Sequence, residues 1–342
     1  MQPSTKLSLF LITVLQVSDI TYAQTVGICA SPTIRREWRE LSDTDKKSFH
    51  EANLCLRNRP QQLYPEESVV VSRADDLTWT HRVLGDNKLI HSVANFFPWH
   101  RMFVYEHERA LRSECGYTGP YAYWDWTIDA DADAVSTSPI WDPIVGFGGN
   151  GVPTGNSTAG FQRCVVDGPY ANTTLRIGSP LGASAAVDEP HCLTREWNNG
   201  EKDSDGDWII GNMSSPLYNS EAIARISALA NYDAFQALQS GPHQDVHNVV
   251  RGDMLYFYSP SDVLFFLHHA NVDRIWAEWQ GNNATRLNDY TGFNDVRKSE
   301  KASLNDTLPT LKLLPDGDPY AVKDFMNIKA GKLCYEYSSK SS

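Results

Sequence analysis

Six histidines in two groups are the residues of this sequence whose types and spacing could do chemistry. The first group is His81, His91 and His100, and the second is His243, His247 and His269. Neutral imidazoles bind borderline metals such as zinc, copper and iron. Two sets of three imidazoles, with no cysteine among them, predict two redox-capable ions rather than a structural zinc.

The spacing within the second group indicates two helices. His243 and His247 are four residues apart, so a helix would place both imidazoles on one face, close enough for one ion. His269 must then come from a different helix. We expect a site of three imidazoles that is open on one side for a small ligand.

The first group requires an interrupted helix. His91 and His100 are nine residues apart, and a rotation of about 100° per residue would put them on opposite faces of one helix. Pro98 supplies the interruption. We therefore expect His91 before the helix, His100 in its first or second turn, and His81 on the preceding helix.

The residues around these histidines are given other roles. Asp273 lies four residues after His269, and we expect it to orient that ring through its other nitrogen. His268 adjoins His269, but neighbours on a helix point about 100° apart, so only one can face the site. The remaining histidines are interpreted as structural; they are His50, His107, His191 and His268.

Helical periodicity recurs through most of the chain. It predicts helices over residues 31–57, 66–83, 98–112, 220–240, 243–250 and 261–280. Between Ser136 and Asp207, turn-forming residues predict long surface loops with short strands. The tail beyond Asn294 is predicted to be mostly irregular. The expected fold class is mainly α, a single domain over residues 24–342 whose helix-bundle core holds the metals.

Composition limits the partners. The 342 residues include 10 Trp, 15 Tyr and 13 Phe, enough for a substantial core. The formal net charge of −12 and the lack of a basic cluster make nucleic acid and anionic membrane poor partners. A small-molecule substrate is expected instead.

The N-terminus and the sequons indicate secretion. Residues 1–23 are predicted to be a signal peptide, because Lys6 precedes an apolar run, Leu7 to Val17, too short to span a bilayer. The mature chain would begin near Gln24. Five sequons predict an extracellular protein with N-glycans at some of Asn156, Asn172, Asn212, Asn283 and Asn305.

Six cysteines in an oxidising compartment suggest up to three disulfides. They are Cys29, Cys55, Cys115, Cys164, Cys192 and Cys334. Fifteen sets of pairs are possible, and the sequence does not choose among them. A bond between Cys29 and Cys334 would tie the two ends together.

Two motifs resemble those of the tyrosinase family of type-3 copper proteins, which comprises tyrosinases, catechol oxidases and molluscan hemocyanins. The first motif is matched by His91, Phe96, Phe97, Trp99, His100, Arg101 and Glu108. The second is matched by Asp262, Phe265, His269 and Asp273, with Val263 where proline is usual. Residues 29–56, 164–195 and 334–337 also resemble short secreted fungal enzymes of this family.

The resemblance implies a cofactor and a reaction. His81, His91 and His100 would hold copper A, and His243, His247 and His269 copper B. O2 would be the co-substrate, and o-diphenols would be oxidised to o-quinones. Tyr335 to Tyr337 resembles the motif that closes the family's catalytic core. Since the chain ends five residues later, we expect no C-terminal lid domain.

Departures from the family pattern bear on substrate choice. Leu89 stands where some fungal relatives have a cysteine that forms a thioether with a ligand, so no such bond forms here. Gln239 and Gln244 stand where some monophenol-hydroxylating relatives have Glu and Asn. A neutral amide cannot be the anionic partner of a water that deprotonates the phenol. We therefore expect o-diphenol oxidation with weak or absent monophenol hydroxylation, and we place Asn248 at the pocket mouth, tuning substrate choice.

Other readings remain open at this point. Another group could replace the missing carboxylate, which would make the protein a true tyrosinase. Hemocyanins bind oxygen reversibly at the same kind of site. A zinc protein with two separate three-histidine sites would match the same residues. Oligomeric state and natural phenol are not indicated by the sequence.

Overall fold

The computed structural model describes residues 29–157, 160–178, 188–204, 208–314 and 319–338. The predicted signal peptide, residues 1–23, lies outside this range. Four long helices form the frame of the described residues: α1 (Asp43–Asn58), α2 (Arg73–Asp86), α3 (Phe96–Cys115) and α8 (Leu264–Gly281). The shorter helix α7 (Gln244–Val250) joins them at the second histidine group. The mainly helical fold class is confirmed. No helix in the described part of the chain is both long and apolar enough to cross a membrane.

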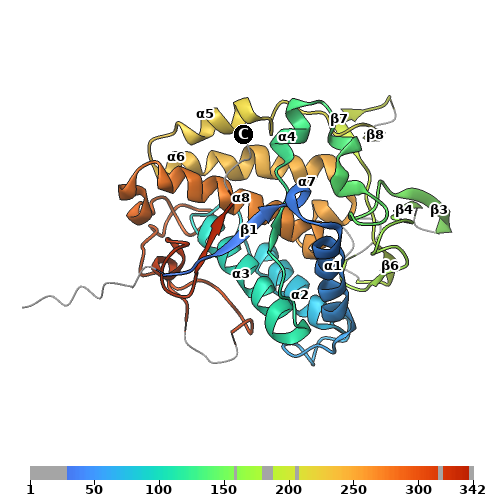
Figure 1. Ribbon diagram of the computed structural model, residues 1–342, viewed down its shortest axis with the longest axis horizontal. Coiled ribbons are helices and arrows are strands. Elements are labelled where there is room, and N and C mark those ends of the chain that lie inside the picture. The colour runs from blue at the N-terminus through green and yellow to red at the C-terminus, as the bar shows by residue number, and fades with distance from the viewer. Residues whose placement is uncertain (1–28, 158–159, 179–187, 205–207, 315–318, 339–342) are drawn as a thin grey trace, which may run out of the picture.

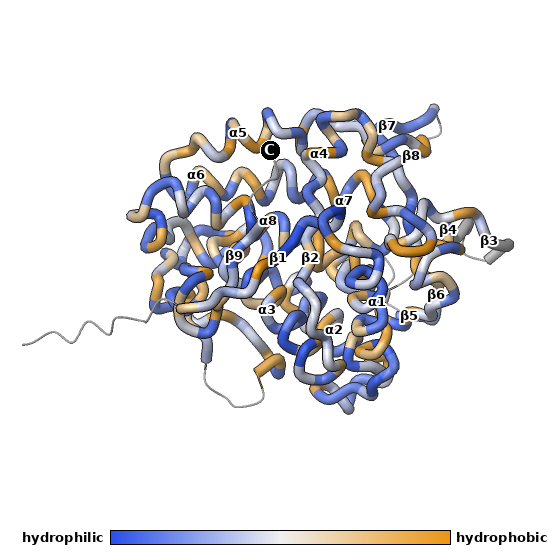
Figure 2. The backbone as a smooth tube through the Cα atoms, in the orientation of Figure 1, coloured by the Kyte–Doolittle hydropathy of each residue, from blue (hydrophilic) through white to orange (hydrophobic). Residues whose placement is uncertain are grey.

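Helix α8 lies in the middle of the molecule (Figure 1). It packs against α3, which in turn contacts α1, and α1 contacts α2. On the other side lie α5 (Ser220–Ser227) and α6 (Tyr232–Phe235), with the short helix α4 (Trp126–Asp131) nearby. Hydrophobic and hydrophilic residues alternate along the helices (Figure 2), as expected for elements with one face on a core. The buried core is rich in aromatic rings, Trp99, Trp276 and Phe265 among them.

The helices begin and end at capping residues, and these positions differ from the predicted ranges. Ser42 caps α1 by accepting from the Asp45 N–H, and Ser72 and Asp75 form a capping box at α2. Helix α3 begins two residues before Pro98. Proline is tolerated there because the N–H groups of a first helical turn have no carbonyl partner within the helix. The helix is terminated by Gly116, which has a left-handed conformation with φ 69°. The predicted helix 220–240 is divided, because the side chain of Asn231 caps a new start at α6.

The prediction of helix over residues 31–41 is wrong. This segment contains strand β1 (Thr33–Glu37), which pairs in parallel with β2 (Ala122–Tyr123) and with β9 (Tyr335–Tyr337). The side chains that this strand buries are those of Arg35 and Glu37, which are charged. The alternation of buried and exposed residues therefore does not appear as an alternation of hydrophobic and polar residues in the sequence. Strand β9 in the tail was also missed, since its partner lies about 300 residues away in the chain.

Short hairpins occupy the predicted loop region at one end of the molecule (Figure 1). They are β3 (Val152–Ser157) with β4 (Gly160–Cys164), β5 (Thr174–Leu175) with β6 (His191–Cys192), and β7 (Asn198–Lys202) with β8 (Trp208–Ile210). Short 3-10 helices span Trp38–Glu40, Val135–Thr137, Pro139–Trp141, Gly252–Leu255, Ser259–Ser261, Ala284–Asn288 and Val322–Phe325.

Three disulfides pair all six cysteines: Cys29–Cys334, Cys55–Cys115 and Cys164–Cys192. The suggested bond between the two ends is confirmed. It fastens β9 beside β1, while the second joins α1 to α3 and the third joins β4 to β6.

Candidate metal centre

The first cluster joins three elements. His81 lies on α2, His91 in the turn before α3, and His100 in the second turn of α3, as the interrupted helix predicted. The Nδ1–H of His81 donates to the Phe257 carbonyl at 2.6 Å, and that of His100 donates to the Phe96 carbonyl at 2.8 Å. A carbonyl only accepts, so each ring carries its proton on Nδ1 and directs a lone pair from Nε2.

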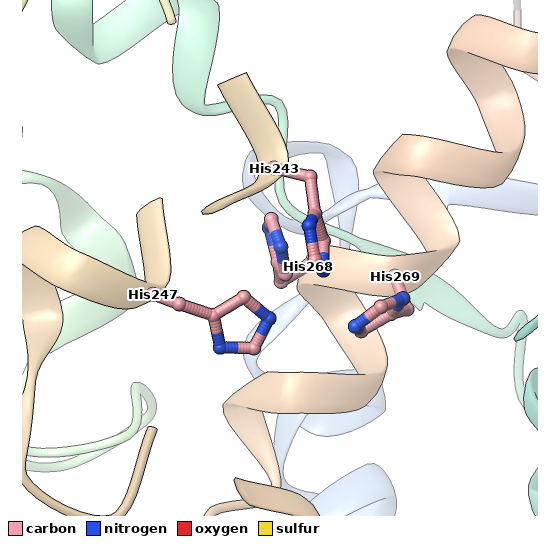
Figure 3. A group of neighbouring side chains, drawn as sticks. All are labelled: His243, His247, His268 and His269. Carbon is pink, nitrogen blue, oxygen red and sulfur yellow. The ribbon is translucent and has the colours of Figure 1, made fainter. Parts of the chain in front are cut away.

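In the second cluster, two histidines are likewise held by hydrogen bonds from Nδ1–H to backbone carbonyls. His243 lies in a π-helical turn, Gln239–His243, and its Nδ1–H donates to the Gln239 carbonyl at 2.9 Å. His247 on α7 donates in the same way to the Met254 carbonyl. His269 comes from α8, and both of its ring nitrogens are buried without a hydrogen-bond partner. Figure 3 shows the three rings directed toward one another.

Burial keeps these imidazoles neutral. It lowers the pKa of His81 to about 3 and that of His247 to about 4. Burial, reinforced by neighbouring histidines, lowers the pKa well below the ordinary value in His91, His100, His243 and His269. Neutral imidazole is the form that binds a metal.

The donor set fits two metal ions. The Nε2 atoms of His81 and His100 face each other at 3.4 Å, although both carry lone pairs. The Nε2 of His243 is buried with no partner. Buried lone pairs without donors are costly. A cation bound by each cluster would satisfy these atoms, and all-imidazole ligation suits copper, zinc or iron.

The two clusters adjoin each other. The ring of His100 stacks on that of His269, with 4.3 Å between centroids and 11° between planes. The His100 and His243 centroids are 6.5 Å apart. The ring of Phe96 contacts both of these histidines, at 4.4 Å and 4.7 Å between centroids. Ions held by the two clusters would therefore be close neighbours, near enough to share one small molecule.

A cavity of about 670 Å³ opens onto the clusters. His81, His91, His243 and His247 line it, together with Gln239 and Gln244. Charged groups at its wall are the exposed Asp233 and Lys298 and the half-buried Asp295. Asn248 is exposed and outside this lining, and its Oδ1 accepts from the Gln244 side chain at 3.2 Å. A role for Asn248 in substrate choice stays a prediction.

The predicted role of Asp273 is wrong. Its carboxylate contacts Arg101 and Arg35 and accepts from the hydroxyls of Tyr335 and Tyr337 at 2.6 Å and 2.5 Å. No hydrogen bond joins it to His269. Asp273 lies one helical turn after His269, where it faces the buried Arg35 and Arg101 rather than the histidine cluster. It ties α8 to α3, β1 and β9.

Sequence reasoning missed His268 as a neighbour of the second cluster. One of its ring nitrogens lies within 4.8 Å of the ligand atoms of His243, His247 and His269. The His268–His269 doublet is the only signal for this in the sequence, and the 100° between neighbouring side chains on a helix predicts that one of the two faces away. The other histidines each use both nitrogens in hydrogen bonds within the protein, as their structural interpretation predicted; they are His50, His107 and His191.

Comparisons with known proteins agree with this geometry. Residues 71–282 match the common central domain of tyrosinase. The tyrosinase-like protein phomQ1 of Diaporthe leptostromiformis is 36% identical, over 98% of this chain and 89% of its own. Tyrosinase ustQ of Aspergillus flavus is 33% identical, over 90% and 80%. A polyphenol oxidase from Thermothelomyces thermophila aligns with a TM-score of 0.75 and 28% identity, over 90% and 89%.

The match to the tyrosinase domain, over a helical core that brings two histidine clusters together beneath a cavity, makes this chain a copper oxidoreductase, and the two clusters are compatible with the dinuclear copper centre that the family implies. The chain belongs to the tyrosinase family.

Proposed function

We propose that the protein is a dicopper polyphenol oxidase that uses O2 to oxidise o-diphenols to o-quinones, with monophenol hydroxylation weak or absent. Two o-diphenols lose four electrons and four protons in all, and one O2 becomes two waters. The contact between His100 and His269 carries the proposal, because it makes two metal ions neighbours beneath one cavity.

The protein's own part is to fix geometry. When bound, the two copper ions would carry electrons between the phenol and O2. His81, His100, His243 and His247 are held through Nδ1 by backbone carbonyls, so their rings are oriented before substrate arrives. The cavity then admits one phenol ring to the exposed side of the clusters.

The preference for o-diphenols rests on the cavity wall. Gln239 and Gln244 both line it, and neither side chain can hold a negative charge. Of the carboxylates at the wall, Asp233 is exposed and accepts from Gln236, whereas Asp295 is half-buried and accepts from Ser299 and Glu300. Both carboxylates are engaged by neighbouring groups, and neither has a hydrogen bond to a histidine of the clusters among the described residues. Oxidation of an o-diphenol to its o-quinone removes two electrons and two protons and inserts no oxygen atom, whereas a monophenol must also gain one oxygen atom.

The test measures O2 consumption by copper-loaded protein with catechol and with phenol, its matching monophenol. We expect rapid oxidation of catechol and little reaction with phenol. Rapid, lag-free oxidation of phenol would instead identify a true tyrosinase. Reversible oxygen binding without quinone would identify a carrier. Uptake of zinc and no copper, when both are supplied, would remove the redox proposal.

We also propose that the protein is secreted and glycosylated. Three disulfides support an oxidising compartment. Four sequon asparagines are exposed: Asn172, Asn212, Asn283 and Asn305; the side chain of Asn156 lies outside the described residues. N-terminal sequencing of protein from culture medium should begin near Gln24, and endoglycosidase should reduce its mass. Retention in the cell with an intact N-terminus would contradict secretion.

A further inference from the structure

Helix α8 brings two consecutive histidines to the second cluster, and their rings occupy different places. The His269 ring stacks on His100 and so lies between the two clusters. The His268 ring stacks on His243, with 5.2 Å between centroids and 20° between planes, and meets His247 edge-on at 4.8 Å. Figure 3 shows His268 beside His243. Both side chains of the doublet are buried, so four imidazoles surround one metal position.

A hydrogen bond from Trp126 distinguishes the two. The Trp126 indole N–H donates to Nδ1 of His268 at 3.2 Å. An indole can only donate, so Nδ1 of His268 must accept, and a neutral ring then carries its proton on Nε2. This tautomer is opposite to that of His81, His100, His243 and His247. One nitrogen of His268 has its lone pair engaged, and the other, Nε2, is a buried N–H without an acceptor, so neither offers a lone pair to a metal in this tautomer.

The segment from Trp124 to Trp126 is fixed against α8. The backbone N–H of Trp124 donates to the Leu267 carbonyl at 3.2 Å, one residue before His268. Asp125 forms a buried ion pair with Arg274 of α8 at 3.0 Å. Trp126 itself is fully buried at the start of α4. The indole donor is thus fixed relative to His268.

We propose that Trp126 is a positioning residue that keeps His268 from ligating the metal. Copper B would then be held by three imidazoles, with His269 as the third, and His268 would not fill the position that a catalytic metal site keeps for a small ligand. The inference rests on copper binding, the basis of the proposed function. Without the indole donor, the His268 proton can move to Nδ1, which gives Nε2 a free lone pair.

The test is a double-mutant cycle on copper-loaded protein, with Trp126→Phe, His268→Asn and the double variant. Asn keeps an acceptor near the place of Nδ1 and lacks Nε2. The readouts are copper per chain, the rate of copper loss to a chelator, and the number of imidazole ligands from X-ray absorption. None depends on phenol oxidation, so failure of this inference and failure of the proposed function are distinguishable.

We expect His268→Asn to keep two coppers and the wild-type rate of loss. Trp126→Phe should gain an imidazole ligand and lose copper more slowly, by about tenfold, which is the smallest change that removal of an outer-shell partner causes, here with the opposite sign. The double variant should return to the wild-type rate. Loss of one copper in His268→Asn would overturn the inference, as would an equal change by Trp126→Phe in both backgrounds.

If Trp126→Phe does not fold, nitrogen NMR of the wild-type protein loaded with copper(I) can determine which ring nitrogen of His268 carries the proton. The proposal requires the His268 proton on Nε2. A proton on Nδ1 would overturn it.

Discussion

His100 and His269 lie ring on ring, 4.3 Å apart and within 11° of parallel, although they come from different clusters. Each ring is fixed by a long helix, His100 by α3 and His269 by α8, and these two helices pack directly against each other. The distance between the two metal positions is therefore set by helix packing rather than by a flexible loop.

Replacing either of these two rings should remove one ion. We expect His100→Asn and His269→Asn each to lower bound copper from two to one per chain. Catechol oxidation should fall to background, because a single copper ion cannot accept the two electrons that one catechol loses. Copper analysis and O2 consumption measure this. His107→Asn is the control on the same helix, since His107 contacts Tyr121 and Asn53 and lies outside both clusters. Two coppers in His100→Asn would contradict the ligand assignment.

Adding a carboxylate at the cavity wall should change substrate choice. The variant Gln239→Glu with Gln244→Asn places an anion where a water beside the clusters could be activated. We expect the ratio of phenol to catechol oxidation to rise about a hundredfold, the lower range for a general base. Gln236→Glu adds the same charge elsewhere on the wall and should have little effect. An unchanged ratio in the double variant would show that the missing base does not limit hydroxylation.

Asp273 should be important for stability rather than for copper ligation. Burial opposes ionisation of this carboxyl, but Arg101 and Arg35 outweigh it and hold its pKa below the ordinary value. Asp273→Asn leaves two buried arginines without their shared anion, so we expect a loss of about 3–5 kcal/mol in the free energy of unfolding at pH 7. Asp86→Asn, in an exposed pair with Arg82, should cost less than about 1 kcal/mol.

Urea unfolding at several pH values checks this. A lowered pKa in the folded state stabilises the protein above the unfolded pKa of about 4, and this contribution is lost as the pH falls through the folded value. The difference between wild type and Asp273→Asn should therefore shrink under acid conditions. A difference that is constant down to pH 2 would contradict the ionised state.

His191 should give a pH dependence of opposite sign. Burial disfavours its charge, but the hydrogen bond from its Nε2 to Asp253, 3.0 Å long, and the charge of Asp253 raise the pKa above the ordinary value. A raised folded pKa stabilises fully below the unfolded value of about 6.5 and is lost as the pH rises through the folded value. The stability advantage of wild type over His191→Gln should decline as the pH rises above about 6.5. In an Asp253→Asn background this decline should disappear; its persistence there would assign it to another group.

The sequence by itself determined which residues could bind metal and much of the helical frame. The four-residue step between His243 and His247 and the helix start marked by Pro98 are local features, and helical geometry turns them into positions. Capping residues such as Ser42 also act within a few positions of the chain. Local rules therefore sufficed for these features.

Tertiary structure alone decided the long-range contacts. Strand β1 was hidden because its inward residues, Arg35 and Glu37, are charged and find their partners far away in the chain, as Arg35 does at Glu108. Asp273 is directed to arginines rather than to His269, and His268 is held by Trp126, 142 residues earlier. Hydrogen bonds and ion pairs of this kind depend on which elements meet in space, and no periodicity along the chain records that.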